Sequence, residues 1–166
     1  QAVYPAKFQL VAAMNPCPCC YLGHPSKPCR CTPESIARYR SKISGPLLDR
    51  IDLTIEVPSL PAAELMQQQA GESSADVLQR VLAARDRQYA RQGKVNAALS
   101  VTELDGAANI EQEARDALGA MLEKLSLSAR SFHRIMRVAR TLADLADDDA
   151  VGRSHVLKAI SFRRAL

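Results

Sequence analysis

One arginine, Arg50, stands where a tight turn leads into a predicted strand. Residues 44–53 have the sequence SGPLLDRIDL. Its Gly-Pro pair ends any preceding helix, and residues 51–57 alternate apolar and polar side chains up to the next proline, which predicts a strand. A guanidinium at this junction is a long cation held rigidly at a surface, where it can meet a phosphate or a carboxylate. The alternative is an ordinary surface arginine that pairs with Asp49 or Asp52.

A second group of reactive side chains is the cysteines, because all five lie between residues 17 and 31. Clustering of this kind in a chain without secretory features favours a metal site over disulfides. Two C-x-C pairs can supply four thiolates to one tetrahedral zinc ion. Cys20 is a fifth candidate, His24 could replace one thiolate, and the alternative is a set of free or oxidised cysteines. The predicted ligands are Cys17, Cys19, Cys29 and Cys31.

Composition limits the class of protein. The 166 residues are 47% hydrophobic, which is enough for one domain with a real core. No apolar run approaches the roughly 20 residues of a membrane helix, and no signal peptide is visible, so we expect a cytoplasmic protein without a membrane partner. The net charge of +4 permits a nucleic-acid partner. Basic residues are in excess in residues 1–60 and 126–166, and the middle of the chain is acidic.

The N-terminal part of the chain carries a second predicted strand. Residues 8–14 form a nearly continuous apolar run, which is typical of a strand buried on both faces. Asn15 follows this run, and open α/β sheets bind ligands beyond the C-terminal ends of their strands. Asn15 can therefore orient a water molecule or contact a phosphate. The alternative is a turn-forming asparagine before Pro16.

Helical patterns dominate the rest of the sequence. Thr32, Pro33 and Glu34 are typical of a helix start, and a break rich in proline and glutamine predicts a hinge at residues 61–72. Beyond the hinge, residues 73–166 are expected to form a four-helix lid bundle, with a short extra helix near residue 103. The four predicted helices are 73–92, with Val77, Leu78, Val81, Leu82 and Tyr89 on one side, 110–125, a helix capped by Ser128, and 153–163.

The helix that begins after Ser128 carries arginines opposite its apolar stripe. At about 100° per residue, Arg130, Arg134 and Arg137 share one face of this helix. Each of them can be a solvated surface residue, and spacing alone does not choose among them.

Three stretches in a fixed order carry a resemblance to a known family. They are residues 10–16 (LVAAMNP), the segment 44–53, and residues 128–145 (SARSFHRIMRVARTLADL). Together they resemble the sensor 1, arginine-finger and sensor 2 motifs of AAA+ ATPases of the magnesium-chelatase branch, most of all the bacterial ComM/YifB family. The resemblance implies that Arg50 acts in trans on a neighbouring subunit's nucleotide, that Asn15 is sensor 1, and that Arg130 is sensor 2. It also implies a hexameric, ATP- and Mg-dependent motor that acts on DNA in branch migration during natural transformation.

One departure from that family shapes the prediction. The sequence contains no G-x-x-x-x-G-K-[ST] phosphate loop and no apolar strand that ends in paired acids. The resemblance therefore implies the C-terminal part of the ATPase, which should be inactive alone. Residues 1–60 would be the end of the AAA+ α/β core, with two strands, and the fold in this chain would be mainly α. The alternatives are a zinc-stabilised, non-enzymatic module that binds nucleic acid or protein, or a true magnesium-chelatase subunit.

The two predicted strands are expected to be unusual. In AAA+ folds the strand that carries the phosphate loop lies between them, and this sequence lacks it. Residues 8–14 and 51–57 would then have unpaired edges. We therefore expect a well-packed helical bundle after the hinge and a rearranged N-terminal part.

Overall fold

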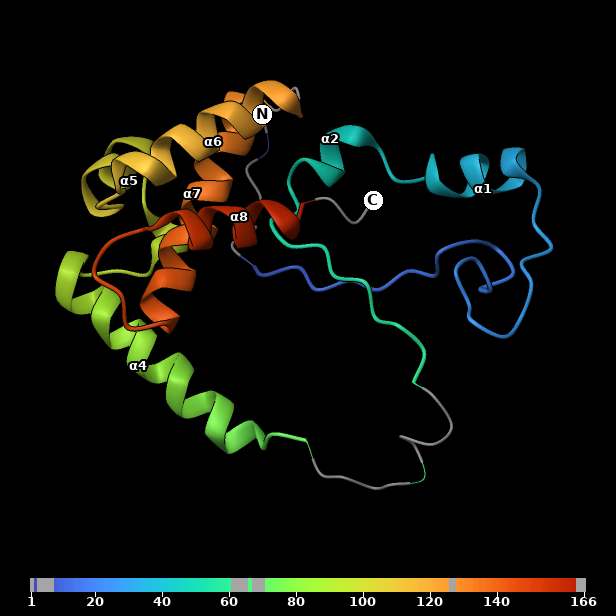
Figure 1. Cartoon of the computed structure of the whole chain (residues 1–166), viewed down its shortest axis with the longest axis horizontal. Coiled ribbons are helices and arrows are strands. Elements are labelled where there is room, and N and C mark those ends of the chain that lie inside the picture. Colours follow the sequence, from blue (N-terminus) through green and yellow to red (C-terminus); the bar gives the residue numbers. More distant parts are fainter. Residues whose placement is uncertain (1, 3–7, 61–65, 67–70, 126–127, 164–166) are drawn as a thin grey trace. The chain divides into compact units, whose positions relative to one another are not determined.

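The computed structural model of the chain describes residues 2, 8–60, 66, 71–125 and 128–163 (Figure 1). Residues 1–45 and 46–166 form two compact units. Helices are the regular elements of the described residues, and the one β contact there is an isolated bridge between Ile110 and Val151. The mainly α fold is thereby confirmed. No helix among the described residues has both the length and the apolar character needed to cross a membrane.

The described residues of the first unit form an irregular loop and one helix. Residues 8–31 have turns and bends but no helix or strand, and α1 (Pro33–Arg40) follows. The hydroxyl of Thr32 accepts a hydrogen bond from the backbone N–H of Ser35 at 3.2 Å, and Pro33 occupies the first turn. The predicted helix start is therefore confirmed, because capping depends only on neighbouring residues.

Both predicted strands are wrong as secondary structure. Residues 8–14 and 51–57 are extended but form no ladder with any described residue. Their apolar side chains face solvent, with Val11 85% and Val57 89% exposed. An alternating or apolar pattern makes a strand only where a partner supplies hydrogen bonds. The expectation that these two segments would lack their neighbour agrees with this arrangement.

The second unit is a set of packed helices with well-defined ends. Ser73 and Ser128 cap α4 and α7 by accepting hydrogen bonds from the backbone N–H groups three residues ahead, and Gly93 ends α4 in the left-handed region at φ 71°. Ser100 and Glu103 form a capping box at α5. The elements are α2 (Gly45–Leu48), α4 (Ser74–Gln92), η1 (Asn96–Ala98), α5 (Val101–Ala107), α6 (Gln112–Lys124), α7 (Ala129–Leu145) and α8 (Arg153–Ser161).

Helix α7 is the centre of the second unit. It packs against α4, α5 and α8, and α6 packs against α8 (Figure 1). The core that these helices enclose is made of small and branched side chains, which allow close helix approach. Its buried apolar residues are Leu99, Leu104, Ala108, Ala114, Leu118, Ile135, Met136, Ala139, Ala143, Val151, Val156, Ala159 and Ile160.

Helix α4 corrects one part of the predicted bundle. Its expected apolar side is largely exposed, with the residues of its first half between 39% and 51% accessible. The buried residues of α4 are instead Ala84 and Gln88. Helix periodicity shows which residues share a face, but a neighbouring element must cover that face before it is buried. The exposed residues are Val77, Leu78, Val81, Leu82 and Tyr89.

A buried ionic network joins α4, α7 and the loop after α7. The carboxylate of Asp144 accepts hydrogen bonds from Arg91 at 2.6 and 3.0 Å, from Arg140 at 3.0 Å and from Asn96 at 2.8 Å. Arg140 is fully buried and also donates to the carbonyls of Asp148 and Asp149. Although burial acts to raise it, the hydrogen bonds from Arg91 and Asn96 hold the pKa of Asp144 below its usual value.

The domain boundaries remain a prediction. Most of the predicted hinge at 61–72 lies outside the described residues.

The network predicts a stability change. Asp144→Ala leaves Arg140 buried without its carboxylate, so the free energy of unfolding should fall by about 3–5 kcal/mol. Asp149→Ala is the matched control, because that side chain is 97% exposed and should matter little. Urea unfolding followed by helical circular dichroism measures both.

The same experiment has a pH arm. A carboxyl group whose pKa is lowered by folding stabilises the protein above its ordinary pKa and loses that contribution as pH falls through the lowered value. The difference between wild type and Asp144→Ala should therefore shrink in acid. If wild type and Asp144→Ala were equally stable at neutral pH, the proposed role of the network would be contradicted.

Candidate functional site

Four of the five cysteines meet in one cluster. The Sγ atom of Cys17 lies 3.4 Å from that of Cys19 and 3.7 Å from that of Cys29, and the Sγ atoms of Cys19 and Cys29 are 3.6 Å apart. All four ligand atoms, including that of Cys31, lie within 4.8 Å of one another. Cys17 is fully buried, and the other three are partly exposed.

Local turns bring the two C-x-C pairs together. The backbone N–H of Cys20 donates to the carbonyl of Cys17 at 3.0 Å, which closes the first turn. A second turn follows, in which His24 donates its backbone N–H to Tyr21 and Gly23 takes φ 78°. Glycine is suited to this left-handed conformation because it lacks a Cβ atom. The chain thus reverses direction between the two pairs.

Backbone N–H groups point at the sulfur atoms. Those of Arg30 and Tyr21 donate to Cys19 and lower its pKa to about 6. The N–H of Cys31 acts in the same direction on Cys29, but burial and the neighbouring thiols of Cys19 and Cys17 raise the pKa of Cys29 to about 12. Thiols packed this closely resist full ionisation, and a bound cation would remove that resistance.

The remaining candidate ligands lie outside the cluster. Cys20 is exposed and adopts φ 68°. His24 uses Nδ1 to accept hydrogen bonds from the backbone N–H groups of Ser26 at 3.2 Å and Lys27 at 3.1 Å. The imidazole therefore stabilises the loop, and the cluster of potential ligands contains cysteines alone.

The cluster has the dimensions of a zinc site. Four sulfur atoms at about 2.3 Å from a tetrahedral zinc ion are separated by about 3.8 Å. The three measured separations of 3.4–3.7 Å are close to that value. A possible metal-binding site of four thiolates is therefore present in the first unit.

Arg50 lies just after the short helix α2 in the second unit. Its backbone N–H donates to the carbonyl of Leu47 at 2.9 Å, and its guanidinium donates to the carbonyl of Pro46 at 2.7 Å. The side chain is exposed, and it forms no ion pair with a carboxylate of the described residues. The turn therefore holds the arginine at the surface.

The two acids beside Arg50 pair with other arginines. Asp52 accepts a hydrogen bond from Arg134 of α7 at 2.6 Å, and the same nitrogen donates to the backbone carbonyl of Arg50 at 2.7 Å. Asp49 lies 3.8 Å from Arg163, at the end of α8. The alternative in which Arg50 pairs with Asp49 or Asp52 is therefore absent from this structure.

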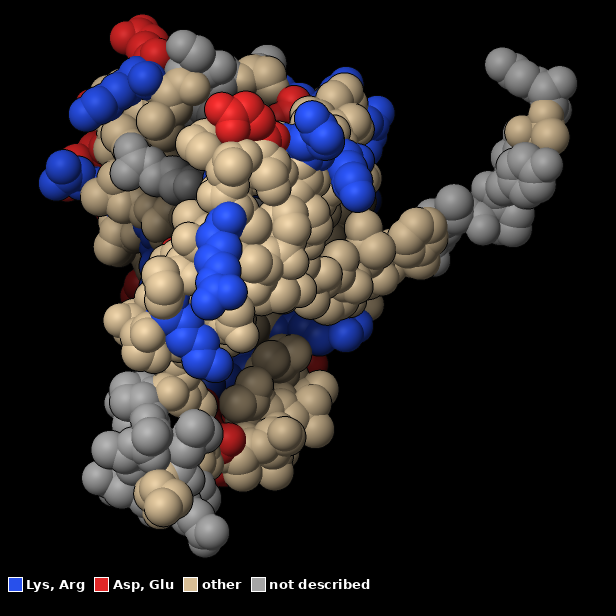
Figure 2. All heavy atoms as spheres, turned by 90° about the vertical axis from the view of Figure 1, so that its right-hand side faces the viewer, with Lys and Arg blue, Asp and Glu red and all other residues tan. Residues whose placement is uncertain are grey.

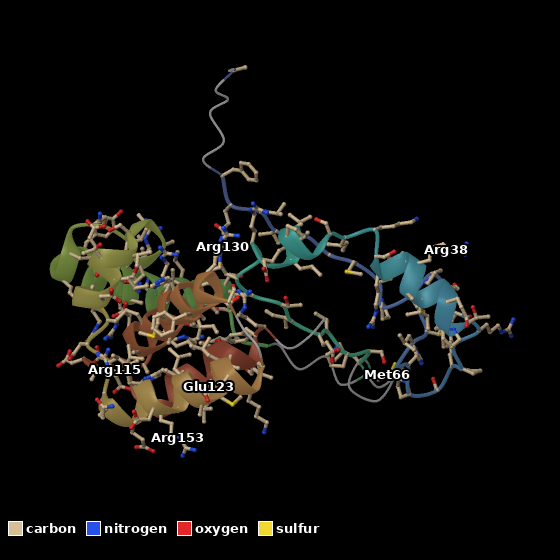
Figure 3. The ribbon with its side chains drawn as sticks, turned by 90° about the horizontal axis from the view of Figure 1, so that it is seen from above. Arg38, Met66, Arg115, Glu123, Arg130 and Arg153 are labelled. Carbon is tan, nitrogen blue, oxygen red and sulfur yellow. The ribbon has the colours of Figure 1, made fainter. Side chains whose placement is uncertain are left out.

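Of the three arginines on one face of α7, two have structural partners. Arg134 contacts Asp52, and Arg137 donates to the carbonyl of Leu99 at 2.8 Å. Arg130 is exposed in the first turn of α7 and has no hydrogen bond or ion pair with another described residue (Figure 3). Arg130 is thereby distinguished from its neighbours on physical grounds.

Asn15 lies in the first unit, in the extended segment before the cysteine loop. It is exposed and does not follow a strand.

The sequence did not predict the contact between Arg134 and Asp52, because the two partners are 82 residues apart. It also missed the hydrogen bond from the Thr54 backbone N–H to the carbonyl of Phe162 at 2.7 Å, which ties the same segment to the end of α8.

Two family models match the chain. One, described as magnesium chelatase, subunit ChlI, matches residues 1–65. The other, described as magnesium chelatase, subunit ChlI C-terminal, matches residues 71–163.

Curated relatives agree with these models. The protein YifB of Escherichia coli is 47% identical over 96% of this chain, and the competence protein ComM of Haemophilus influenzae is 43% identical over the same share. A protein of Mycobacterium tuberculosis is 40% identical over 98% of the chain. The chain spans about a third of the length of these relatives (31–33%). Since the C-terminal model covers more than half of the sequence, the chain belongs to the magnesium chelatase subunit ChlI family.

Proposed function

We propose that this chain is the nucleotide-responsive C-terminal region of an AAA+ ATP-driven motor that acts on DNA. The observation that carries the proposal is the state of Arg50. Its two neighbouring acids are neutralised by Arg134 and Arg163, and its own guanidinium bonds only to a carbonyl among the described residues. An exposed cation in this state can leave its carbonyl for a phosphate at small cost.

Arg50 would act in trans as an arginine finger. Transfer of a γ-phosphoryl group spreads negative charge over its equatorial oxygens, and a guanidinium from a neighbouring subunit stabilises that charge. The nucleotide site would bind ATP and Mg. This sequence lacks the phosphate loop that such a site needs. The chain would therefore complete a site that another part of the assembly provides, as in a hexamer.

Arg130 would be the sensor 2 residue. It lies in the first turn of α7, the helix that one turn later carries Arg134. Arg134 contacts residues 49–54, which we call the finger segment. A movement of α7 that follows nucleotide binding at Arg130 would be passed to the carbonyl of Arg50 through Arg134. Asn15 would act as sensor 1, in a strand that forms when its neighbour is present.

The choice of DNA as substrate rests on kinship. One relative is named a competence protein, and the family resemblance is to motors of branch migration. A second candidate function is a subunit of magnesium chelatase, which the descriptions of both family models favour. Magnesium insertion into a porphyrin, assayed with the assembled motor, separates the two.

The cysteine cluster would hold a structural zinc. Among the described residues of the first unit, Cys17 is the only buried one and the eight-residue helix α1 buries none, so little of the unit's stability comes from a hydrophobic core. A metal that binds four thiolates supplies folding free energy to such a small unit. In this proposal the four cysteines have a structural role and no catalytic one.

Zinc content tests this site. Protein purified without chelator should contain about one zinc per chain, and Cys17→Ser or Cys29→Ser should reduce that content severalfold because thiolate coordination is lost. Cys20→Ser is the matched control and should retain the metal. A wild-type chain with less than a tenth of an equivalent and four reactive thiols would refute the site.

Arg50 is tested in the full-length motor. Arg50→Ala should leave nucleotide binding nearly intact and reduce ATP turnover by about 10³-fold or more, because only the transition state loses a partner. Mixing this variant with a phosphate-loop variant should restore part of the activity. Unchanged turnover in Arg50→Ala would rule out the trans role.

The contact between α7 and the finger segment is tested by amide exchange in this chain. Arg134→Ala removes the bonds to Asp52 and to the Arg50 carbonyl, so exchange at Thr54 should accelerate at least about fivefold. Lys124→Ala, an exposed cation on α6, is the control. Identical exchange in all three proteins would show that Arg134 does not hold the segment.

A further inference from the structure

The positive charge of the chain is concentrated in the unit that contains the cysteine cluster. Residues 1–45 include six Lys and Arg but one acid, Glu34, whereas residues 46–166 include 16 basic and 17 acidic residues. The first unit therefore carries all of the chain's net positive charge. Figure 2, which views the molecule from the right-hand side of Figure 1, shows Lys and Arg side chains together with some acids on this face.

The described cations of the first unit have no carboxylate partner among the described residues. All of them are exposed. In the second unit, by contrast, eight Lys and Arg side chains form such pairs, from Arg80 to Arg163. Cations gathered without internal partners favour an external anion. These side chains are Lys27, Arg30, Arg38, Arg40 and Lys42.

Beside the cysteine cluster, two of these cations and an aromatic ring line an open hollow. Its volume is about 520 Å³, it is open to solvent, and Cys19 and Pro28 complete its lining. Tyr21 is 37% exposed there, and the Nζ atom of Lys27 lies 5.2 Å from the centre of its ring. The fold of the loop around the cysteines fixes the position of Tyr21 beside Arg30.

We propose that this hollow, formed by Tyr21, Lys27 and Arg30, binds single-stranded nucleic acid. The ammonium of Lys27 lies over the tyrosine ring, so a base that stacks there would take its place while Lys27 and Arg30 meet the phosphates on either side. A stacked base with cations on its phosphates is the usual combination for single strands. A duplex keeps its bases stacked inside and would leave the ring unused. The basic residues of α1 extend the phosphate contacts. In the proposed motor the strand is DNA, and this choice of DNA rests on the proposed function. The binding site itself is argued from the hollow and its charges alone.

The binding test uses the zinc-loaded 166-residue chain without nucleotide. Fluorescence anisotropy with labelled dT20 should show binding at low salt that weakens as salt rises, because counterions are released from the strand. A 20-base-pair duplex should bind at least about tenfold more weakly, since stacking on the ring is lost. Labelled rU20 should bind within a few-fold of dT20, because phosphates and ring faces are common to both.

Matched variants locate the site. Tyr21→Ala should weaken dT20 binding about tenfold, whereas Tyr89→Ala, an exposed tyrosine of the second unit, should not. Lys27→Ala with Arg30→Ala should lower the salt slope by about 1.4, at about 0.7 for each lost phosphate contact. Arg115→Ala with Lys124→Ala, two exposed cations of α6, is the charge control.

Zinc content of each variant shows that its loop is intact. If Lys27→Ala with Arg30→Ala loses zinc, Arg38→Glu on α1 with Lys42→Glu just after it replaces that variant and should weaken binding at least about tenfold. Unchanged dT20 binding in the zinc-containing variants, equal binding of the duplex, or no binding by the wild-type chain would each overturn the proposal. The outcome is independent of the Arg50→Ala result, which judges ATP turnover alone.

Discussion

The ion pair between Arg134 and Asp52 positions the segment around Arg50 against the helices of the second unit. The finger segment has no sheet to join among the described residues, so its position depends on contacts with the helices. Arg134 binds both the Asp52 carboxylate and the Arg50 carbonyl, and Arg163 lies beside Asp49. Both acids beside Arg50 thus pair with other arginines, and Arg50 itself pairs with neither, as its proposed role in trans requires.

The two units are stabilised by different means. The helical unit has an apolar core and, within it, a carboxylate that is held by Arg91 and Arg140. Removing one partner of such a buried pair costs more than the pair itself contributes, so the network fixes how α4 and α7 meet. The first unit relies on turns and N–H···S contacts around four thiols. A metal at that cluster would also fix Tyr21 and Arg30, which lie on its loop.

Sequence patterns predicted the features that depend on neighbouring residues. Helix caps at Thr32, Ser73 and Ser128 follow from local hydrogen bonding, and the C-x-C pairs meet because two short turns lie between them. The predicted strands failed because a strand needs a partner that may be distant or absent in sequence. Arg140 resembled any arginine of an amphipathic helix, and its burial depends on carbonyls of the following loop. The pairing of Asp52 with Arg134 could not be predicted either, since charge patterns along a sequence favour the nearby Arg50 as the partner of Asp52.

A structure of the full-length protein with ADP and aluminium fluoride, which mimics the phosphoryl group in transfer, tests the proposed trans role of Arg50 most directly. The Arg50 guanidinium should lie within about 3 Å of the fluoride on a neighbouring subunit's nucleotide. Arg134 should remain bonded to Asp52. A structure in which Arg50 still donates to the Pro46 carbonyl, while another cation contacts the fluoride, would contradict that role.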